Sequence, residues 1–166
     1  MVHRMGHSAW LAAILMTVFV LGASSTAHAQ PSVGFSGGGS IDPEQGFVGV
    51  FFQTSDVGGG FRFRTGIDGG FGNGLRVATV NIDFIYLLPL GQGPWKFVTG
   101  GGPAISITKL SDDELSEFYG LGTDVSGGYS YLFGFAHDMG FFTEFRLGGG
   151  NVPSMKFLAG YQFKFQ

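Results

Sequence analysis

Apolar and polar residues alternate through most of the chain after residue 30, and most clearly near its end. From Met155 to Phe165, every second position is apolar, and mostly polar residues or glycine stand between. Segments 60–67, 75–88 and 140–148 show the same period. A period of two residues puts successive side chains on opposite faces of a β-strand. The pattern therefore predicts strands with one apolar and one polar face.

Clusters of glycine, proline, asparagine and aspartate separate these segments, as expected of turns between strands. Residues 68–70, 136–138 and 151–153 are among the predicted turns. Segment 46–54 has an ambiguous alternation, because Val50, Phe51 and Phe52 are adjacent. The eight predicted strands are Ser32–Gly38, Gly46–Thr54, Gly60–Ile67, Leu75–Leu88, Trp95–Lys109, Leu121–Phe133, Gly140–Gly148 and Met155–Phe165.

Two architectures fit two-faced strands. A soluble barrel or sandwich buries the apolar face, whereas a membrane barrel turns that face to lipid and keeps the polar face inside. The positions of the aromatic residues favour the membrane barrel. In an up-and-down barrel with both ends in the periplasm, a set of them falls near one rim, as in the aromatic girdles of membrane barrels. The predicted interfacial aromatics are Tyr86, Trp95, Phe97, Tyr131, Phe133 and Phe141.

The first 29 residues have a different character. Arg4 precedes an apolar run from Trp10 to Leu21, and Ala27-His28-Ala29 follows. This is the layout of a cleaved secretory signal, and the run is short for the alternative, a retained membrane anchor. We therefore expect a signal peptide over 1–29 and, over 30–166, an all-β, eight-stranded antiparallel up-and-down transmembrane β-barrel.

Composition narrows the chemistry. The chain has no cysteine, which excludes disulfides, thiolate metal sites and a lipid-modified cysteine. Without Arg4, the residues after 29 include eight basic and twelve acidic side chains, a net charge of −4. An acidic balance gives no electrostatic reason to expect nucleic acid as a partner. After Gln30 no apolar run is long enough for a membrane helix.

Two short patterns carry a resemblance. Tyr86-Leu87-Leu88-Pro89-Leu90 leads into Gly93–Val98, and Gly160, Phe163 and Phe165 form a glycine followed by spaced aromatics. The chain resembles the small eight-stranded outer-membrane barrels of the opacity-protein type. It departs from them in Gln166, which follows the expected terminal aromatic, and in Leu158, where a polar residue is usual.

The resemblance implies a location in the bacterial outer membrane, among its lipid and lipopolysaccharide. It also implies insertion by the barrel-assembly machinery of that membrane, with Gly160, Phe163 and Phe165 as the assembly signal. It identifies no extracellular partner and no single shared activity.

Charged residues on the polar faces predict a network in the lumen. A basic side chain facing lipid at mid-depth would cost ~2–4 kcal/mol, so these residues are expected inside. An eight-stranded interior is just filled by side chains, which favours pairing over a water path. Glu144 is expected to pair with Arg146, and Arg62 to lie diagonally across from Asp83. The predicted lumen charge network is Arg62, Arg64, Asp83, Asp124, Glu144, Arg146 and Lys156.

Other chemical candidates are weaker. Lipid-A-modifying serine hydrolases need a histidine base near the nucleophile, but His137 has no serine nearby in sequence. The acidic segment Asp112–Glu117 is expected to be a solvated outer loop, with a divalent-cation site as its alternative. We expect no catalytic residue, cofactor or bound metal.

The sequence thus favours a non-enzymatic outer-membrane barrel with a structural or surface-interaction role. The alternatives are a narrow channel or hydrophobic-ligand conduit and, less favoured, a lipid-A-modifying enzyme.

The Ala27-His28-Ala29 pattern predicts cleavage after Ala29. N-terminal sequencing of the protein purified from the cell envelope should begin at Gln30. An intact Met1 in the envelope fraction would contradict this expectation.

Overall fold

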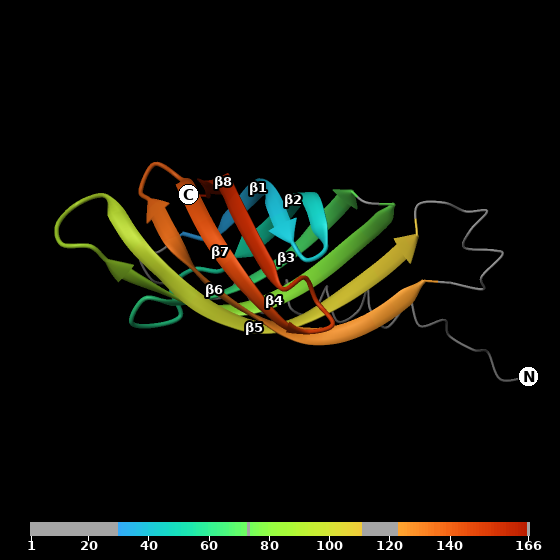
Figure 1. Cartoon of the computed structure of the whole chain (residues 1–166). Helices are drawn as coiled ribbons and strands as arrows, with labels where there is room; N and C mark the ends of the chain where they lie inside the picture. The colour runs from blue at the N-terminus through green and yellow to red at the C-terminus, as the bar shows by residue number, and fades with distance from the viewer. Residues whose placement is uncertain (1–29, 73, 111–122, 166) are drawn as a thin grey trace, which may run out of the picture.

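A computed structural model describes residues 30–72, 74–110 and 123–165, which form one closed barrel of eight strands (Figure 1). The predicted signal peptide and the acidic segment Asp112–Glu117 lie outside the described residues. Within the described part of the chain, no helix is long and apolar enough to cross a bilayer. The strands are β1 (Ser32–Ile41), β2 (Glu44–Gln53), β3 (Phe61–Gly72), β4 (Leu75–Pro89), β5 (Trp95–Leu110), β6 (Asp124–His137), β7 (Phe141–Gly150) and β8 (Met155–Lys164).

Each strand pairs antiparallel with the next along the chain, and β1 pairs with β8 to close the barrel. Closure leaves no strand edge unpaired. A β-sheet in lipid requires this, because no water is present there to bond free backbone N–H and C=O groups. β1 begins and β8 ends at the same end of the barrel, here called the termini end. The fold class predicted from the sequence, an eight-stranded antiparallel barrel, is confirmed.

β3 continues past a predicted turn. The sequence Asp68-Gly69-Gly70 indicates a turn, yet β3 runs through it to Gly72. Asp68 keeps the alternation and points into the barrel, where it is buried. Gly70 makes room for the ring of Phe47, because a Cβ built on Gly70 would lie 2.5 Å from Phe47 Cζ. The glycines of this segment therefore serve close packing inside β3.

β6 also extends beyond its predicted end. The sequence predicts a strand that stops at Phe133 and a turn over 136–138, whereas β6 reaches His137. Pairing with β5 explains the extension, because Trp95 stands opposite His137 and Phe97 opposite Phe135 in the ladder. The hairpin of β5 and β6 is therefore longer than the alternation alone indicates.

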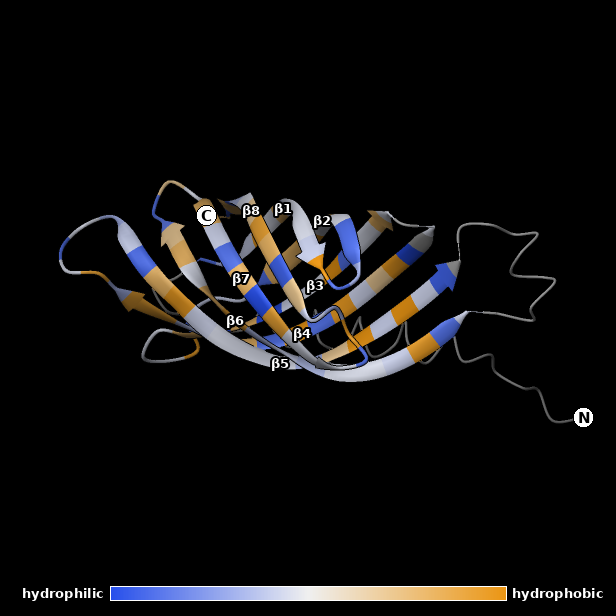
Figure 2. Cartoon of the chain, viewed as in Figure 1, coloured by the Kyte–Doolittle hydropathy of each residue, from blue (hydrophilic) through white to orange (hydrophobic). Residues whose placement is uncertain are grey.

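The outer face of the barrel wall is apolar and its inner face is polar, as expected of a barrel that is surrounded by lipid. Side chains such as Phe63, Val50 and Ile67 point outward and are 47–49 % exposed. Arg64, Asp83 and Glu144 point inward and are at most 4 % exposed. Figure 2 shows apolar bands along the strands. A water-soluble barrel has the reverse arrangement, so the structure favours the membrane architecture of the two that fit the sequence.

Inward glycines make room for inward phenylalanine rings. A Cβ on Gly34 would lie 2.2 Å from Phe51 Cζ, and one on Gly160 would lie 2.7 Å from Phe142 Cζ. The rings of Phe51 and Phe142 meet edge to face inside the barrel, with centroids 5.4 Å apart. The space that β1 and β8 leave by lacking side chains at these positions is thus taken up by rings from β2 and β7.

Gly34→Ala should therefore destabilise the barrel by about 1–3 kcal/mol, the usual cost of overpacking a filled interior. The Phe51 ring is confined by Phe142 and by Arg64, so it has little room to move. The measurement is urea unfolding of protein refolded into lipid vesicles.

Gly39→Ala in the same strand is the matched control, because its Cβ would meet nothing closer than 3.6 Å. The control should change stability by about 0.5 kcal/mol or less. Adding Phe51→Leu to Gly34→Ala should restore part of the loss. Equal effects of the two alanine substitutions would contradict the packing argument.

Candidate functional site in the filled interior

The interior is filled in two layers. The apolar layer lies toward the termini end. Its side chains come from five strands, β2, β4, β5, β6 and β7, and are 9 % exposed or less. Leu87 packs against it. The apolar layer consists of Phe51, Ile85, Val98, Leu132, Ala136 and Phe142.

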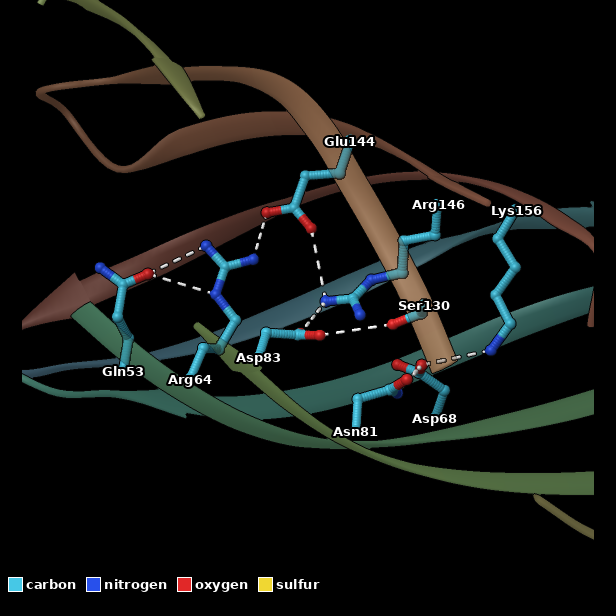
Figure 3. Close-up of polar contacts among 9 residues, drawn as sticks. All are labelled: Gln53, Arg64, Asp68, Asn81, Asp83, Ser130, Glu144, Arg146 and Lys156. Carbon is cyan, nitrogen blue, oxygen red and sulfur yellow. Dashed lines mark hydrogen bonds and ion pairs between the residues drawn. The ribbon is translucent and has the colours of Figure 1, made fainter. Parts of the chain in front are cut away.

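The second layer is an ion network at mid-height (Figure 3). It consists of three basic and three acidic side chains, each 10 % exposed or less. Its formal charge therefore sums to zero. Neutrality matters here, because an uncompensated charge in a poorly solvated interior is costly. The ion network consists of Arg64, Asp68, Asp83, Glu144, Arg146 and Lys156.

Arg64 on β3 and Glu144 on β7 form the pair that spans the lumen. Because β3 and β7 are four strands apart in a ring of eight, they stand on opposite walls. Arg64 also donates hydrogen bonds from Nε and Nη2 to Gln53 Oε1, at 3.2 and 2.9 Å. Its guanidinium lies 4.5 Å from the ring centroid of Phe51. Arg64 therefore joins the ion network to the apolar layer.

Arg146 links two acids. Its Nη2 lies 2.8 Å from Asp83 Oδ2 and 3.7 Å from Glu144 Oε2. Ser130 Oγ donates to Asp83 Oδ1 at 3.3 Å. Nε and Nη1 of Arg146 have no protein partner, and Arg146 lines a cavity of about 10 Å³. A cavity of this size holds about one water molecule.

Lys156 and Asp68 form the third pair, from β8 and β3. Lys156 Nζ lies 3.3 Å from Asp68 Oδ2, and Asn81 Nδ2 donates to the same oxygen at 3.0 Å. Lys156 Nζ also lies 4.2 Å from the ring centroid of Phe47, a cation–π contact. Every basic member of the network thus contacts an acid, and two of them also contact an aromatic ring.

Five of the seven residues predicted for the lumen network lie in it. Asp124 does not, which corrects the prediction. Its position in the alternation is inward, but β7 pairs with β6 only from Gly128 onward, so Asp124 stands beyond the end of the neighbouring strand and is exposed. Among the described residues it forms no ion pair.

Arg62 lies diagonally across from Asp83, as predicted, but Asp83 forms its ion pair with Arg146. In the ladder of β3 and β4, Arg64 stands opposite Asp83, and Arg62 stands opposite Ile85. Arg62 is half-buried and closer to the termini end, and Asp56 and Arg64 are the charges that act on it. Asp68 belongs to the network although the sequence does not predict it there, because Asp68-Gly69-Gly70 indicates a turn. It continues the even-numbered series of Arg62 and Arg64.

The predicted interfacial aromatics all point outward and contact other rings. Tyr86 packs against Phe61, Trp95 against His137, Phe97 against Phe135 and Phe141 against Tyr161. Tyr131 and Phe133 lie near the middle of β6, and Phe133 stacks on Phe145. In the proposed assembly signal, Gly160 faces inward beside Phe142, whereas Phe163 and Phe165 are exposed.

A polar cluster surrounds the β6–β7 turn at the termini end. Lys96 Nζ lies 2.6 Å from Asp138 Oδ1, and Lys164 Nζ donates to the Asp138 carbonyl at 2.9 Å. The hydrogen bond from Lys96 holds the pKa of the Asp138 carboxyl below its ordinary value. His137 packs on Trp95, and its Nδ1 accepts a hydrogen bond from the Met139 N–H. This histidine is therefore held by local turn contacts.

Solved structures share the eight-stranded fold of this chain. Neisserial surface protein A superposes with a TM-score of 0.59 and 14 % identity over 82 % of this chain and 96 % of its own. The N-terminal β-barrel domain of Pseudomonas aeruginosa OprF gives 0.58 and 14 % over 83 % and 100 %. The fold is that of small eight-stranded outer-membrane barrels. This confirms the resemblance drawn from the sequence, and at such identity the likeness concerns the fold alone.

The same fold includes an enzyme. The outer membrane enzyme PagL superposes with a TM-score of 0.50 and 10 % identity over 81 % of this chain and 99 % of its own. The barrel by itself therefore does not decide whether this chain is catalytic. No protein-family model matches the chain, and no curated protein matches it.

Glu144→Gln should destabilise the barrel by about 3–5 kcal/mol, because it leaves Arg64 buried without its acidic partner. Asp124→Asn, at an exposed position, should change stability by about 0.5 kcal/mol or less. Urea unfolding in lipid vesicles compares the two, and equal losses would contradict a buried ion network.

Double variants test which partner matters most. Arg64→Met added to Glu144→Gln should recover much of the loss, since the uncompensated cation is gone. Arg146→Met added to Glu144→Gln should recover less, because it also removes the basic partner of Asp83. Greater recovery with Arg146→Met would contradict the pairing across the lumen.

Proposed function

We propose that this chain is a non-catalytic, non-conducting barrel of the bacterial outer membrane, with a structural or surface-interaction role. The observation that carries the proposal is the filled interior. An apolar layer and a neutral ion network lie one after the other along the lumen. Ions crossing such an interior would have to displace both layers, which weighs against the narrow-channel alternative.

The outer surface supports the membrane location. Large apolar side chains such as Phe71, Val48 and Tyr129 are 60–66 % exposed on the wall of the barrel. A water-soluble protein rarely exposes a continuous apolar surface of this extent. The outer-membrane barrels with the same fold support the same location.

The contacts of His137 support a non-catalytic role. A histidine base works by taking a proton from a nucleophile held within hydrogen-bond reach. Nδ1 of His137 accepts the Met139 N–H at 3.1 Å, and its ring packs on Trp95. These contacts are those of a turn residue that shapes the rim of the barrel.

Planar-bilayer recordings test the non-conducting role. The protein should insert without steady ion conductance, because side chains of both layers fill the lumen. Insertion is checked separately by electrophoresis, in which a folded barrel changes mobility when the sample is boiled. Steady conductance by protein that passes this check would favour the channel, and altered lipid A masses in cells producing the protein would favour the enzyme.

A further inference from the structure

The lumen opening at the termini end carries three basic side chains. Arg62 on β3, Lys96 on β5 and Lys164 on β8 stand at inward positions of the alternation, each within two residues of the strand end there. These strands are two or three apart in the ring of eight, so the cations surround the opening from different sides. Arg62 and Lys96 are both close enough for their charges to act on Lys164. The three residues are here called the basic rim.

Acidic side chains compensate the basic rim in part. Lys96 Nζ lies 2.6 Å from Asp138 Oδ1, whereas Lys164 donates to the Asp138 carbonyl and not to its carboxylate. Asp56 acts on Arg62 by its charge, but its carboxylate accepts backbone N–H groups of its own turn. Among the described residues, Arg62 and Lys164 form no ion pair with a carboxylate. Three cations and two carboxylates leave these groups with a net charge of +1.

Unpaired donors lie directly beneath the basic rim. Ser32 stands opposite Lys164 in the ladder of β1 and β8, and opposite Gln53 in that of β1 and β2. Gln53 Oε1 accepts from Arg64, which turns Gln53 Nε2 away from the ion network (Figure 3). Gln53 Nε2, Ser32 Oγ and Arg62 Nε are buried and have no hydrogen-bond partner within the described part of the chain. Because unpaired buried donors are costly, an acceptor brought to this opening would be stabilised by them.

A phosphate group suits these donors better than a carboxylate does. Its oxygens point in several directions, so it accepts from donors on different sides of the opening, whereas the two oxygens of a carboxylate lie in one plane. The planar guanidinium of Arg62 can donate to two phosphate oxygens at once, and a lysine ammonium adds a point charge. A phosphate diester carries one negative charge, and a monoester carries about −2 at neutral pH. The net positive charge offsets much or all of this.

We infer that the lumen opening at the termini end binds a phosphate group between Arg62 and Lys164, with Gln53 and Ser32 as uncharged donors beneath. The group belongs to a soluble phosphate ester or to a lipid headgroup, since both present the same oxygens. Lys164 is exposed and Arg62 is half-buried, so both reach the solution. The apolar layer lies below the site and closes it toward the ion network. The inference goes beyond the proposed function and does not depend on whether the lumen conducts.

Phosphorus NMR measures the binding directly. The protein is folded in micelles of octyl glucoside, an uncharged detergent without phosphate, and titrated with glycerol phosphate or with dihexanoyl phosphatidylglycerol. The phosphorus resonance of each probe should shift and saturate at one equivalent per chain. Tighter binding of glycerol phosphate would identify a soluble ester as the ligand, and tighter binding of the short-chain lipid would identify a headgroup. Either order supports the site.

Four variants separate the site from general attraction by positive charge. Arg62→Gln and Lys164→Gln should each weaken binding about tenfold or more, as expected for the loss of a charged hydrogen bond. Arg76→Gln removes one positive charge at the opposite end of the barrel and is the matched control, so affinity should change less than about twofold, as expected of a distant, screened charge. Asp138→Asn should tighten binding about threefold, since it removes a competing negative charge.

The boiling-dependent change in mobility first establishes that each variant is folded. Absence of a saturable shift with both probes would overturn the proposal. A loss of affinity in Arg76→Gln as large as that in Arg62→Gln would also overturn it, because the phosphate would then be attracted by overall charge alone. Weaker binding by Asp138→Asn would place the phosphate away from the basic rim and likewise contradict the inference.

Discussion

In lipid, a strand wall satisfies its backbone hydrogen bonds only by closing on itself, and closure with eight strands leaves room inside for little besides side chains. The pairing of β1 with β8 meets the first demand. The second constraint, the lack of room inside eight strands, determines how the interior is packed. Inward charges have neither bulk water nor lipid headgroups to contact, so each must find its partner within the lumen. Arg64 reaches Glu144 on the opposite wall for this reason, and the six charges of the network cancel.

The same narrowness explains the glycines. Rings as large as those of Phe51 and Phe142 enter a small barrel only where facing positions carry no side chain, as at Gly34 and Gly160. Gly37, on the outer face of β1, has a different consequence, since together with small side chains on β7 and β8 it leaves the wall hollow. Small residues thus make room for aromatic rings on the inner face of the wall and leave a groove on its outer face.

Alternation sufficed to predict the strands, the closed barrel and the inward charges, because side-chain parity is a local property of a strand. Partners across the lumen are not local. Whether Arg64 or Arg62 meets an acid depends on the register and stagger of four strands, which no short pattern encodes. The sequence does not place Asp68 in the lumen because Asp-Gly-Gly is typical of a turn. Parity places Asp124 in the lumen because it does not reveal where the neighbouring strand ends.

A neutral, filled lumen has consequences for recognition. Paired charges at mid-height largely cancel one another's field at a distance, so the network contributes little to attraction of charged molecules from outside. Attraction of charged molecules then depends on the rims. At the termini end, two lysines, Lys96 and Lys164, stand beside one aspartate, Asp138. The outer wall offers a shaped surface as well, in the hollow lined by Phe35, Gly37 and Ala159. The interior stabilises the barrel, and the surfaces that face lipid and the rim are left to interact with other molecules.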